Sequence, residues 1–191
     1  MLLREVSRCL TYCHRHLSLF RLSPMWEFTC QSKEFDPSYN LKWSDVRNLG
    51  PNGFELNLPA SKTDPFRKGV LIPYFANAST ICPVKAMATY RNLHRLRQPH
   101  RDAPLLVTQL GAPLTRTFFL EKLAIMTDRL HYPPGRYSGH SFRSGAATTA
   151  AARQVPDHLI KTLGRWQSDC YNRYIKVSPV TIRDAQQRMS Q

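Results

Sequence analysis

Three short runs of alternating apolar and polar residues, separated by turn-forming residues, most constrain the fold of this chain. The runs are LKWSDV at 41–46, FELNLPAS at 54–61 and VLIPY at 70–74, with GPNG and KTDPFRKG between them. A period of two is typical of strands with one buried face, and clusters of Gly, Pro and Asn are typical of tight turns. The pattern predicts a three-stranded antiparallel meander, with its prolines at strand ends or edges.

The chain after this meander predicts helices. Pro156 fits the first turn of a helix and Gly164 fits its C-terminal cap. At 191 residues, the chain is long enough to bury a core of its own. The expected fold class is α+β, mostly α-helical, with one small three-stranded antiparallel sheet. The expected helices cover 80–97, 115–130, 141–152, 156–164 and 178–189.

The charge balance points to a polyanionic partner. Lys and Arg number 27 against 13 Asp and Glu, which gives a net charge of +14. No apolar run approaches the ~18 residues that a membrane span needs, so nucleic acid is favoured over a membrane. An RNA-binding or membrane-surface protein is supported by the charge alone, because neither an aromatic RNA-binding signature nor a strongly amphipathic anchor helix is visible.

Cysteine usage predicts a reducing, intracellular setting without a metal. The five cysteines are an odd number and have no framework spacing. Cys9, Cys13, His14 and His16 lie close together, but their spacing matches no common zinc pattern and no second ligand pair follows. We therefore expect no metal and no small-molecule cofactor.

A His-x-x-Arg pair stands at the start of an expected helix. His140 and Arg143 are spaced i and i+3, so they share one face. The N-terminus of a helix also offers free backbone N–H groups and partial positive charge, which suit a phosphate. Taken alone the pair is a weak signal, because chance and surface ion pairs explain most such spacings.

The wider context of this pair resembles a known family. GHSFRSGAATTAAA, followed by IKTLGRWQSDCYNRYI, resembles the tyrosine recombinase (phage integrase) superfamily. LKWSDV with LPASKTDPFRKGVLIPY fits the same family, especially the Crypton- and DIRS-like branch of eukaryotic mobile elements. The resemblance runs from 27 to 175 and implies a tyrosine recombinase catalytic domain over 26–191. It also implies DNA integration and recombination, and residence in the nucleus.

The resemblance implies covalent chemistry without metal or nucleotide. A tyrosine attacks a DNA phosphodiester and keeps the bond energy in a protein–DNA link for later rejoining. The nucleophile implied here is Tyr174, ten residues after Gly164. Tyr171 is the local competitor, and we interpret it as packing or DNA-facing. Type IB topoisomerases share this chemistry and are the nearest enzymatic alternative.

The same resemblance assigns the groups that would surround the phosphate. Arg143 matches one of the two family arginines, and His140 matches the acid–base or phosphate-binding histidine. Lys62 matches the lysine of the sheet loop that protonates the leaving 5′ oxygen. The fifth family position falls on Arg165 by its distance to Tyr174, while the neighbouring Trp166 has the expected chemistry. Both stay candidates, since an indole N–H and a guanidinium can each donate to a phosphate oxygen.

The pattern breaks at the first family arginine. That arginine normally lies three residues before the glutamate of an R-x-x-E helix, and Glu27 opens the matching EFT. Pro24 stands in its place, and Arg21 lies one turn earlier. Proline removes the cation and breaks or kinks the helix that presents it. Two hypotheses follow: a DNA-cleaving recombinase impaired at Pro24, and a catalytically inactive DNA-binding module derived from one.

Residues 1–25 form a basic segment that is atypical of the family. The segment could form an amphipathic helix and loosely resembles a mitochondrial presequence. It is too short for the N-terminal helical domain with which family members clamp DNA. The expected partners are double-stranded DNA and further copies of the chain in a homo-oligomer on DNA, with affinity that rests on phosphate contacts.

Overall fold

The chain divides into two compact units in the computed structural model. The structure describes residues 24–31, 34–48, 50–59, 68–79, 82–95 and 100–189. Of these, the residues from Pro24 to Ser138 belong to the first unit and those from Gly139 onward to the second. The candidate residues Lys62 and Arg21 lie outside the described residues, as do the Cys and His residues near the N-terminus. The expected boundary between 1–25 and 26–191 stays a prediction.

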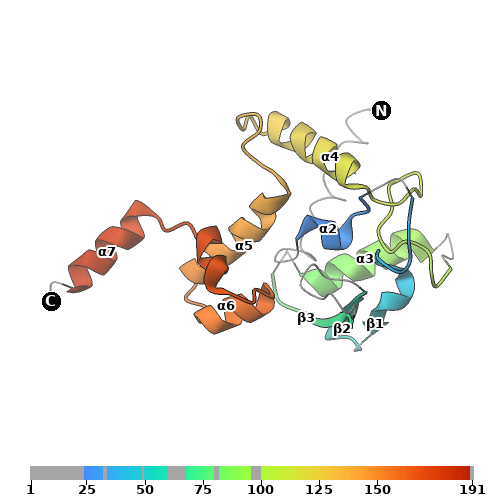
Figure 1. Ribbon diagram of the computed structural model, residues 1–191, viewed down its shortest axis with the longest axis horizontal. Helices are drawn as coiled ribbons and strands as arrows, with labels where there is room; N and C mark the ends of the chain where they lie inside the picture. The colour runs from blue at the N-terminus through green and yellow to red at the C-terminus, as the bar shows by residue number, and fades with distance from the viewer. Residues whose placement is uncertain are drawn as a thin grey trace. The chain divides into compact units, whose positions relative to one another are not determined.

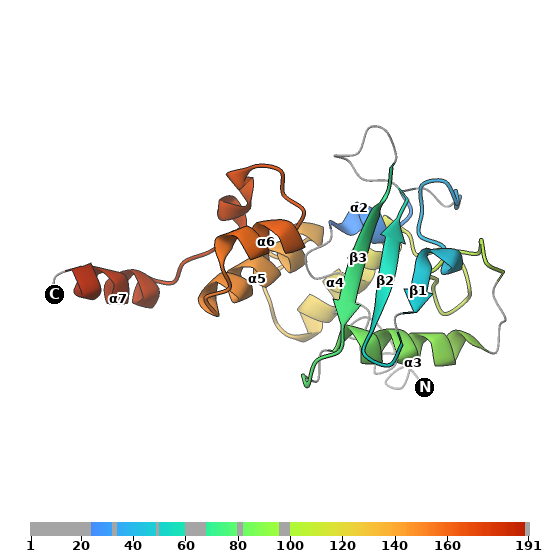
Figure 2. The same cartoon turned by 90° about the horizontal axis from the view of Figure 1, so that it is seen from below.

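A three-stranded antiparallel sheet forms one layer of the first unit. The strands are β1 (Val46–Asn48), β2 (Gly53–Leu58) and β3 (Val70–Phe75). They lie in chain order with β2 in the middle, as Figure 2 shows. In this register Leu56 lies opposite Val46 on one side and Ile72 on the other. The predicted meander is thus confirmed.

The first predicted strand is shorter than its sequence pattern suggested. Residues Trp43–Asp45 form a 3-10 turn, η1, and only Val46 of the predicted run is part of a strand. The Asp45 carboxylate accepts a hydrogen bond from the Lys42 backbone N–H at 3.0 Å and lies 3.4 Å from the Lys42 ammonium nitrogen. Such local side-chain hydrogen bonds compete with strand pairing. Here they hold the backbone in a turn.

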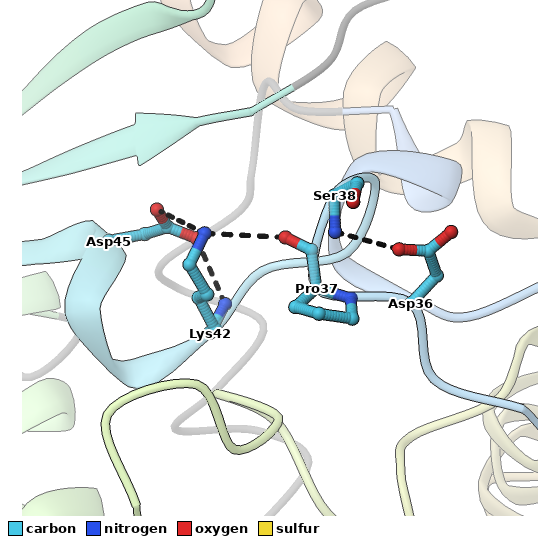
Figure 3. Close-up of polar contacts among 5 residues, drawn as sticks. All are labelled: Asp36, Pro37, Ser38, Lys42 and Asp45. Atoms are coloured by element: carbon cyan, nitrogen blue, oxygen red, sulfur yellow. Dashed lines mark hydrogen bonds and ion pairs between the residues drawn. The ribbon is translucent and has the colours of Figure 1, made fainter.

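Hydrogen bonds also tie this turn to the loop before it. The Lys42 ammonium donates to the Pro37 carbonyl at 3.3 Å, and the Ser38 N–H donates to the Asp36 carboxylate at 2.8 Å (Figure 3). Asp45 is buried, so its charge needs the Lys42 backbone N–H and ammonium group as partners. The contacts fix the path of the chain into β1.

Helices complete the first unit. They are α2 (Met25–Phe28), α3 (Pro83–Arg95) and α4 (Arg116–Arg129). The Thr115 hydroxyl caps α4 by accepting a hydrogen bond from the Phe118 N–H at 3.2 Å. The Tyr90 hydroxyl donates to the Leu105 carbonyl at 2.7 Å, which satisfies the polar end of a fully buried ring. The most buried core residues of this unit are Leu56, Leu58, Tyr90 and Leu105.

The second unit is helical. It contains α5 (Gly139–Ala152), α6 (Asp157–Leu163), the 3-10 helix η2 (Asp169–Tyr174) and α7 (Pro179–Met189). The first three pack against one another, whereas α7 buries no residue and extends away from them in both views (Figures 1 and 2). The core of this unit consists of Ala147, Ile160, Trp166 and Tyr171. None of the described helices is long and apolar enough to cross a membrane.

Candidate functional site

The first turn of α5 carries the His-x-x-Arg pair. His140 is the second residue of the helix and is exposed, whereas the Arg143 side chain one turn later is buried. Burial of an arginine is costly unless its charge and donors find partners. The contacts of Arg143 therefore define the site.

Arg143 connects α5 to the turn that follows α6. One of its terminal nitrogens, Nη2, donates to the Gly164 carbonyl oxygen at 2.6 Å. Its guanidinium carbon lies 4.0 Å from the centroid of the Trp166 ring and 5.9 Å from that of Tyr174. Both distances allow a cation–π attraction. The structure thus brings together three of the predicted site residues, because the Trp166 and Tyr174 rings both lie beside the Arg143 guanidinium.

The Gly-Arg-Trp turn ends α6, and Gly164 is its C-terminal cap, as the sequence predicted. The Arg165 N–H donates to the Thr162 carbonyl and the Trp166 N–H donates to the Lys161 carbonyl, both at 3.0 Å. In this motif the residue after the cap is left-handed. That residue is Arg165, with φ of 54°, whereas Gly164 has an ordinary helical φ of −84°.

Gly164 is required by packing rather than by its backbone angles. A Cβ atom at this position would overlap the six-membered ring of the Trp166 indole. The indole therefore lies directly on the backbone of the turn whose carbonyl accepts the Arg143 hydrogen bond. Glycine and tryptophan act together here to place the carbonyl and the ring against the same guanidinium.

Tyr174 ends η2 and is half-buried. Its ring centroid lies 5.5 Å from that of Trp166. Its carbonyl oxygen accepts hydrogen bonds from the Ser144 hydroxyl at 2.9 Å and the Thr148 hydroxyl at 3.1 Å. Its phenol oxygen makes no hydrogen bond to any residue that the structure describes. The backbone of Tyr174 is thus held on α5 by two side-chain hydroxyls.

Tyr171, the competing tyrosine, lies in a different environment. Its side chain is only 5% exposed, and its ring packs 6.0 Å from Trp166 in the core of the unit. Burial raises the pKa of the Tyr171 phenol, and the charge of Asp157 together with its hydrogen bond raises that pKa further. A buried phenol that resists ionisation is suited to packing and poorly suited to nucleophilic attack.

The two candidates for the fifth position differ in their contacts. Trp166 is 8% exposed, and its ring faces Arg143, Tyr171 and Tyr174. Within the described part of the chain, its indole N–H has no hydrogen-bond partner. Arg165 is half-buried, with its backbone held in the left-handed conformation. Trp166 therefore offers an unused donor close to Tyr174.

An ion pair fixes the segment between α6 and η2. The Lys161 ammonium and the Asp169 carboxylate lie 2.9 Å apart, and their hydrogen bond raises the pKa of Lys161.

No group of three or more His, Cys, Asp and Glu side chains among the described residues is arranged to hold a metal ion. The described side chains that meet here are the Arg143 guanidinium, the Trp166 indole and the Tyr174 phenol.

Pro24 and Glu27 belong to the first unit. Pro24 has extended backbone angles immediately before α2, and Glu27 is buried.

Sequence reasoning did not identify the two hydroxyls that hold the Tyr174 carbonyl. The i, i+4 spacing of Ser144 and Thr148 places both on one face of α5, but it does not indicate which backbone they meet.

The fold is similar to that of solved site-specific recombinases. The XerA recombinase matches with a TM-score of 0.59 and 16% sequence identity, over 98% of this chain and 64% of that chain. The XerH site-specific recombinase in a post-cleavage complex with palindromic difH substrate matches with a TM-score of 0.65 and 12% identity, over 99% and 50%. XerH in a pre-cleavage complex with difH substrate gives 0.54 and 13%, over 96% and 52%.

The likeness establishes the fold of the chain. No protein-family model matches the sequence, and no curated protein is similar to it. The chain spans 64%, 50% and 52% of the lengths of the three recombinase structures. It has the mostly helical fold with a three-stranded antiparallel sheet that tyrosine recombinase catalytic domains have. The fold class predicted from the sequence is confirmed.

Proposed function

We propose that the chain binds double-stranded DNA and breaks and rejoins it in site-specific recombination or integration, with Tyr174 as the nucleophile. The observation that carries this proposal is the grouping of Tyr174, Arg143 and Trp166 in the second unit. A phenol with no hydrogen-bond partner among the described residues lies beside a fixed cation, and the net charge of +14 suits a DNA partner. The recombinase fold supports the same chemistry.

The proposed reaction is a transesterification, in which a DNA phosphoryl group moves from the 5′ oxygen to the Tyr174 phenol oxygen. The Tyr174 phenol oxygen attacks the phosphorus of a DNA phosphodiester and passes its proton to His140, the acid–base candidate. The bond to the 5′ oxygen breaks, and Lys62 supplies a proton to that oxygen. Arg143 and His140 stabilise the charge that develops on the phosphoryl oxygens. Rejoining is the reverse reaction, with a 5′ hydroxyl as the attacking group. No metal or nucleotide cofactor takes part in these steps.

We propose Trp166 for the fifth position. Its indole N–H is unpaired within the described chain, and its ring contacts both Arg143 and Tyr174. An indole N–H without a protein partner can donate to a phosphate oxygen. Arg165 is the alternative, since its guanidinium can donate to the same oxygens.

A DNA-binding module without cleavage is the second candidate function. Pro24 stands where the family has its first arginine, and it offers no cation in its extended position before α2. Loss of one phosphate-binding arginine costs about 3–4 kcal/mol of transition-state stabilisation, or a few hundredfold in rate or more. Such a chain would keep its affinity for DNA and cleave slowly or not at all.

The proposal extends to origin, location and assembly. The motif resemblance supports a Crypton- or DIRS-like mobile element and a nuclear location. Self-association on DNA is supported by α7, which buries no residue and exposes Val180, Ile182 and Met189 by 55%, 49% and 86%. Apolar side chains on an unpartnered helix suit a contact with another protein chain.

Covalent trapping tests the proposed function. The chain is incubated with nicked suicide DNA, and SDS-resistant protein–DNA adducts are counted for the natural sequence and for Pro24→Arg. An adduct from the natural sequence supports the recombinase. An adduct only after Pro24→Arg indicates that the site is otherwise complete. DNA binding without an adduct in either protein favours the second candidate function.

A further inference from the structure

Two hydroxyl groups of α5 converge on one backbone oxygen of the segment that carries Tyr174. The Ser144 and Thr148 hydroxyls donate to the Tyr174 carbonyl at 2.9 and 3.1 Å. The Thr148 oxygen also accepts a hydrogen bond from the Lys176 N–H at 3.1 Å. These three hydrogen bonds hold the chain on both sides of Ile175 against one helix.

This arrangement departs from the usual behaviour of hydroxyl side chains in helices. Ser and Thr normally hydrogen-bond to the carbonyl one turn earlier in their own helix. Thr149 on α5 does so, donating to the Gly145 carbonyl at 2.8 Å, and Thr162 on α6 donates to His158 at 2.8 Å. Ser144 and Thr148 instead donate to a residue 30 and 26 positions away, respectively. Their role is therefore tertiary.

We infer that Ser144 and Thr148 are positioning residues, which fix the Tyr174 backbone relative to Arg143. Ser144 follows Arg143 directly, and Thr148 lies one turn further on the same face. The helix that presents the guanidinium thus also sets the position of the phenol. The catalytic consequence of this inference rests on the proposed function of Tyr174. Its structural consequence rests on the hydrogen bonds alone.

The physical need for such positioning follows from the place of Tyr174 in the chain. It is the last residue of a six-residue 3-10 helix, whose final carbonyl groups lack partners within the helix. Two donors satisfy both lone pairs of its carbonyl oxygen. A misplacement of a reacting group by about 1 Å can cost about 100-fold in rate. Loss of these donors should therefore affect catalysis more than it affects DNA binding.

Thr148→Val and Thr149→Val form a matched pair of variants on adjacent residues of α5. Each removes one hydroxyl and keeps a β-branched side chain, but only Thr148 bonds outside its own helix. Thr148→Ser keeps the hydroxyl and serves as the rescue variant. Ser144→Ala removes the second donor and serves as a milder variant, should Thr148→Val fold poorly.

The structural readout is amide hydrogen exchange at Lys176, measured by NMR on the full chain without DNA. Exchange at Lys176 should accelerate about tenfold in Thr148→Val, as expected when a local hydrogen bond is lost. It should stay unchanged in Thr149→Val and return to the natural rate in Thr148→Ser. Natural exchange in Thr148→Val, or equal acceleration in Thr149→Val, would overturn the inference.

The catalytic readout is the rate of adduct formation at saturating DNA, set beside the DNA dissociation constant. Thr148→Val should slow the adduct about 10- to 100-fold with an unchanged dissociation constant, and Thr148→Ser should restore the rate. A changed dissociation constant with an unchanged rate would overturn the catalytic role. If the natural chain forms no adduct, the proposed function fails, and the exchange at Lys176 still decides whether the Thr148 hydroxyl holds the segment that follows Tyr174.

Discussion

Arg143 donates a 2.6 Å hydrogen bond from its buried guanidinium to the carbonyl of Gly164, 21 residues further along the chain. This contact joins the His-x-x-Arg helix to the Gly-Arg-Trp turn, so the two most conspicuous sequence motifs form one structural feature. Because the Trp166 ring lies on the same turn and the Tyr174 ring lies beside it, a change at the turn reaches all of them.

Gly164→Ala should destabilise the second unit, whereas Gly145→Ala should stabilise it. An alanine Cβ at 164 overlaps the Trp166 indole, which must then leave its place at a cost of about 3 kcal/mol. Gly145 is an exposed residue inside α5, and an alanine Cβ there would meet nothing within 4 Å, so the substitution should gain about 0.5–1 kcal/mol. Urea unfolding of both variants measures the difference. Equal free energies of unfolding would contradict this role of Gly164.

Arg165→Gly and Trp166→Phe should separate the two candidates for the fifth position. Glycine at 165 relieves the left-handed backbone, so the free energy of unfolding should rise by about 1 kcal/mol. Trp166→Phe removes the indole N–H, and loss of one such donor should slow adduct formation about 100-fold. A normal adduct rate in Trp166→Phe with a large loss in Arg165→Gly would assign the position to Arg165 instead.

Tyr171→Phe should change how the stability depends on alkaline pH. Burial raises the pKa of this phenol above its usual value of 10.0. The folded chain therefore holds the proton more tightly than the unfolded chain does. That contribution to stability is complete below pH 10.0 and is lost as pH rises through the higher folded pKa. Unfolding measured between pH 8 and pH 11 should show a smaller alkaline loss in Tyr171→Phe. If the free energies of unfolding of the natural chain and Tyr171→Phe change in parallel over this pH range, folding does not change the pKa of Tyr171.

DNA affinity should fall steeply with salt. The proposed binding rests on phosphate contacts made by a chain with a net charge of +14. We expect the dissociation constant for a duplex to rise about 100-fold or more between 50 and 200 mM KCl, as four or more phosphate contacts would require. Fluorescence anisotropy with labelled duplex DNA measures it. An affinity that is insensitive to salt would contradict an interface built on phosphates.

The sequence predicted the fold well because its signals are local. Alternation and turn residues mark the three strands, and apolar spacing with capping residues marks the helices. The departure from the predicted first strand is a local competition between a side chain and the backbone. At Asp45 a carboxylate bonds to the Lys42 N–H and turns an expected strand into η1.

The candidate site was predictable only in part. Motif order indicated Arg143, Trp166 and Tyr174, which the structure brings together. The roles of Ser144 and Thr148 could not be read from the sequence, because hydroxyl side chains in a helix usually bond to their own helix. Whether they turn outward depends on which backbone the fold places beside them.

The proposed function is tested most directly by identifying the residue that becomes joined to DNA. The adduct from nicked suicide DNA is digested, and the nucleotide-bearing peptide is sequenced by mass spectrometry for the natural chain, Tyr174→Phe and Tyr171→Phe. We expect a phosphotyrosyl link at Tyr174, which is lost in Tyr174→Phe and retained in Tyr171→Phe. A link at Tyr171 or any other residue, or no adduct from a chain that still binds DNA, would contradict it.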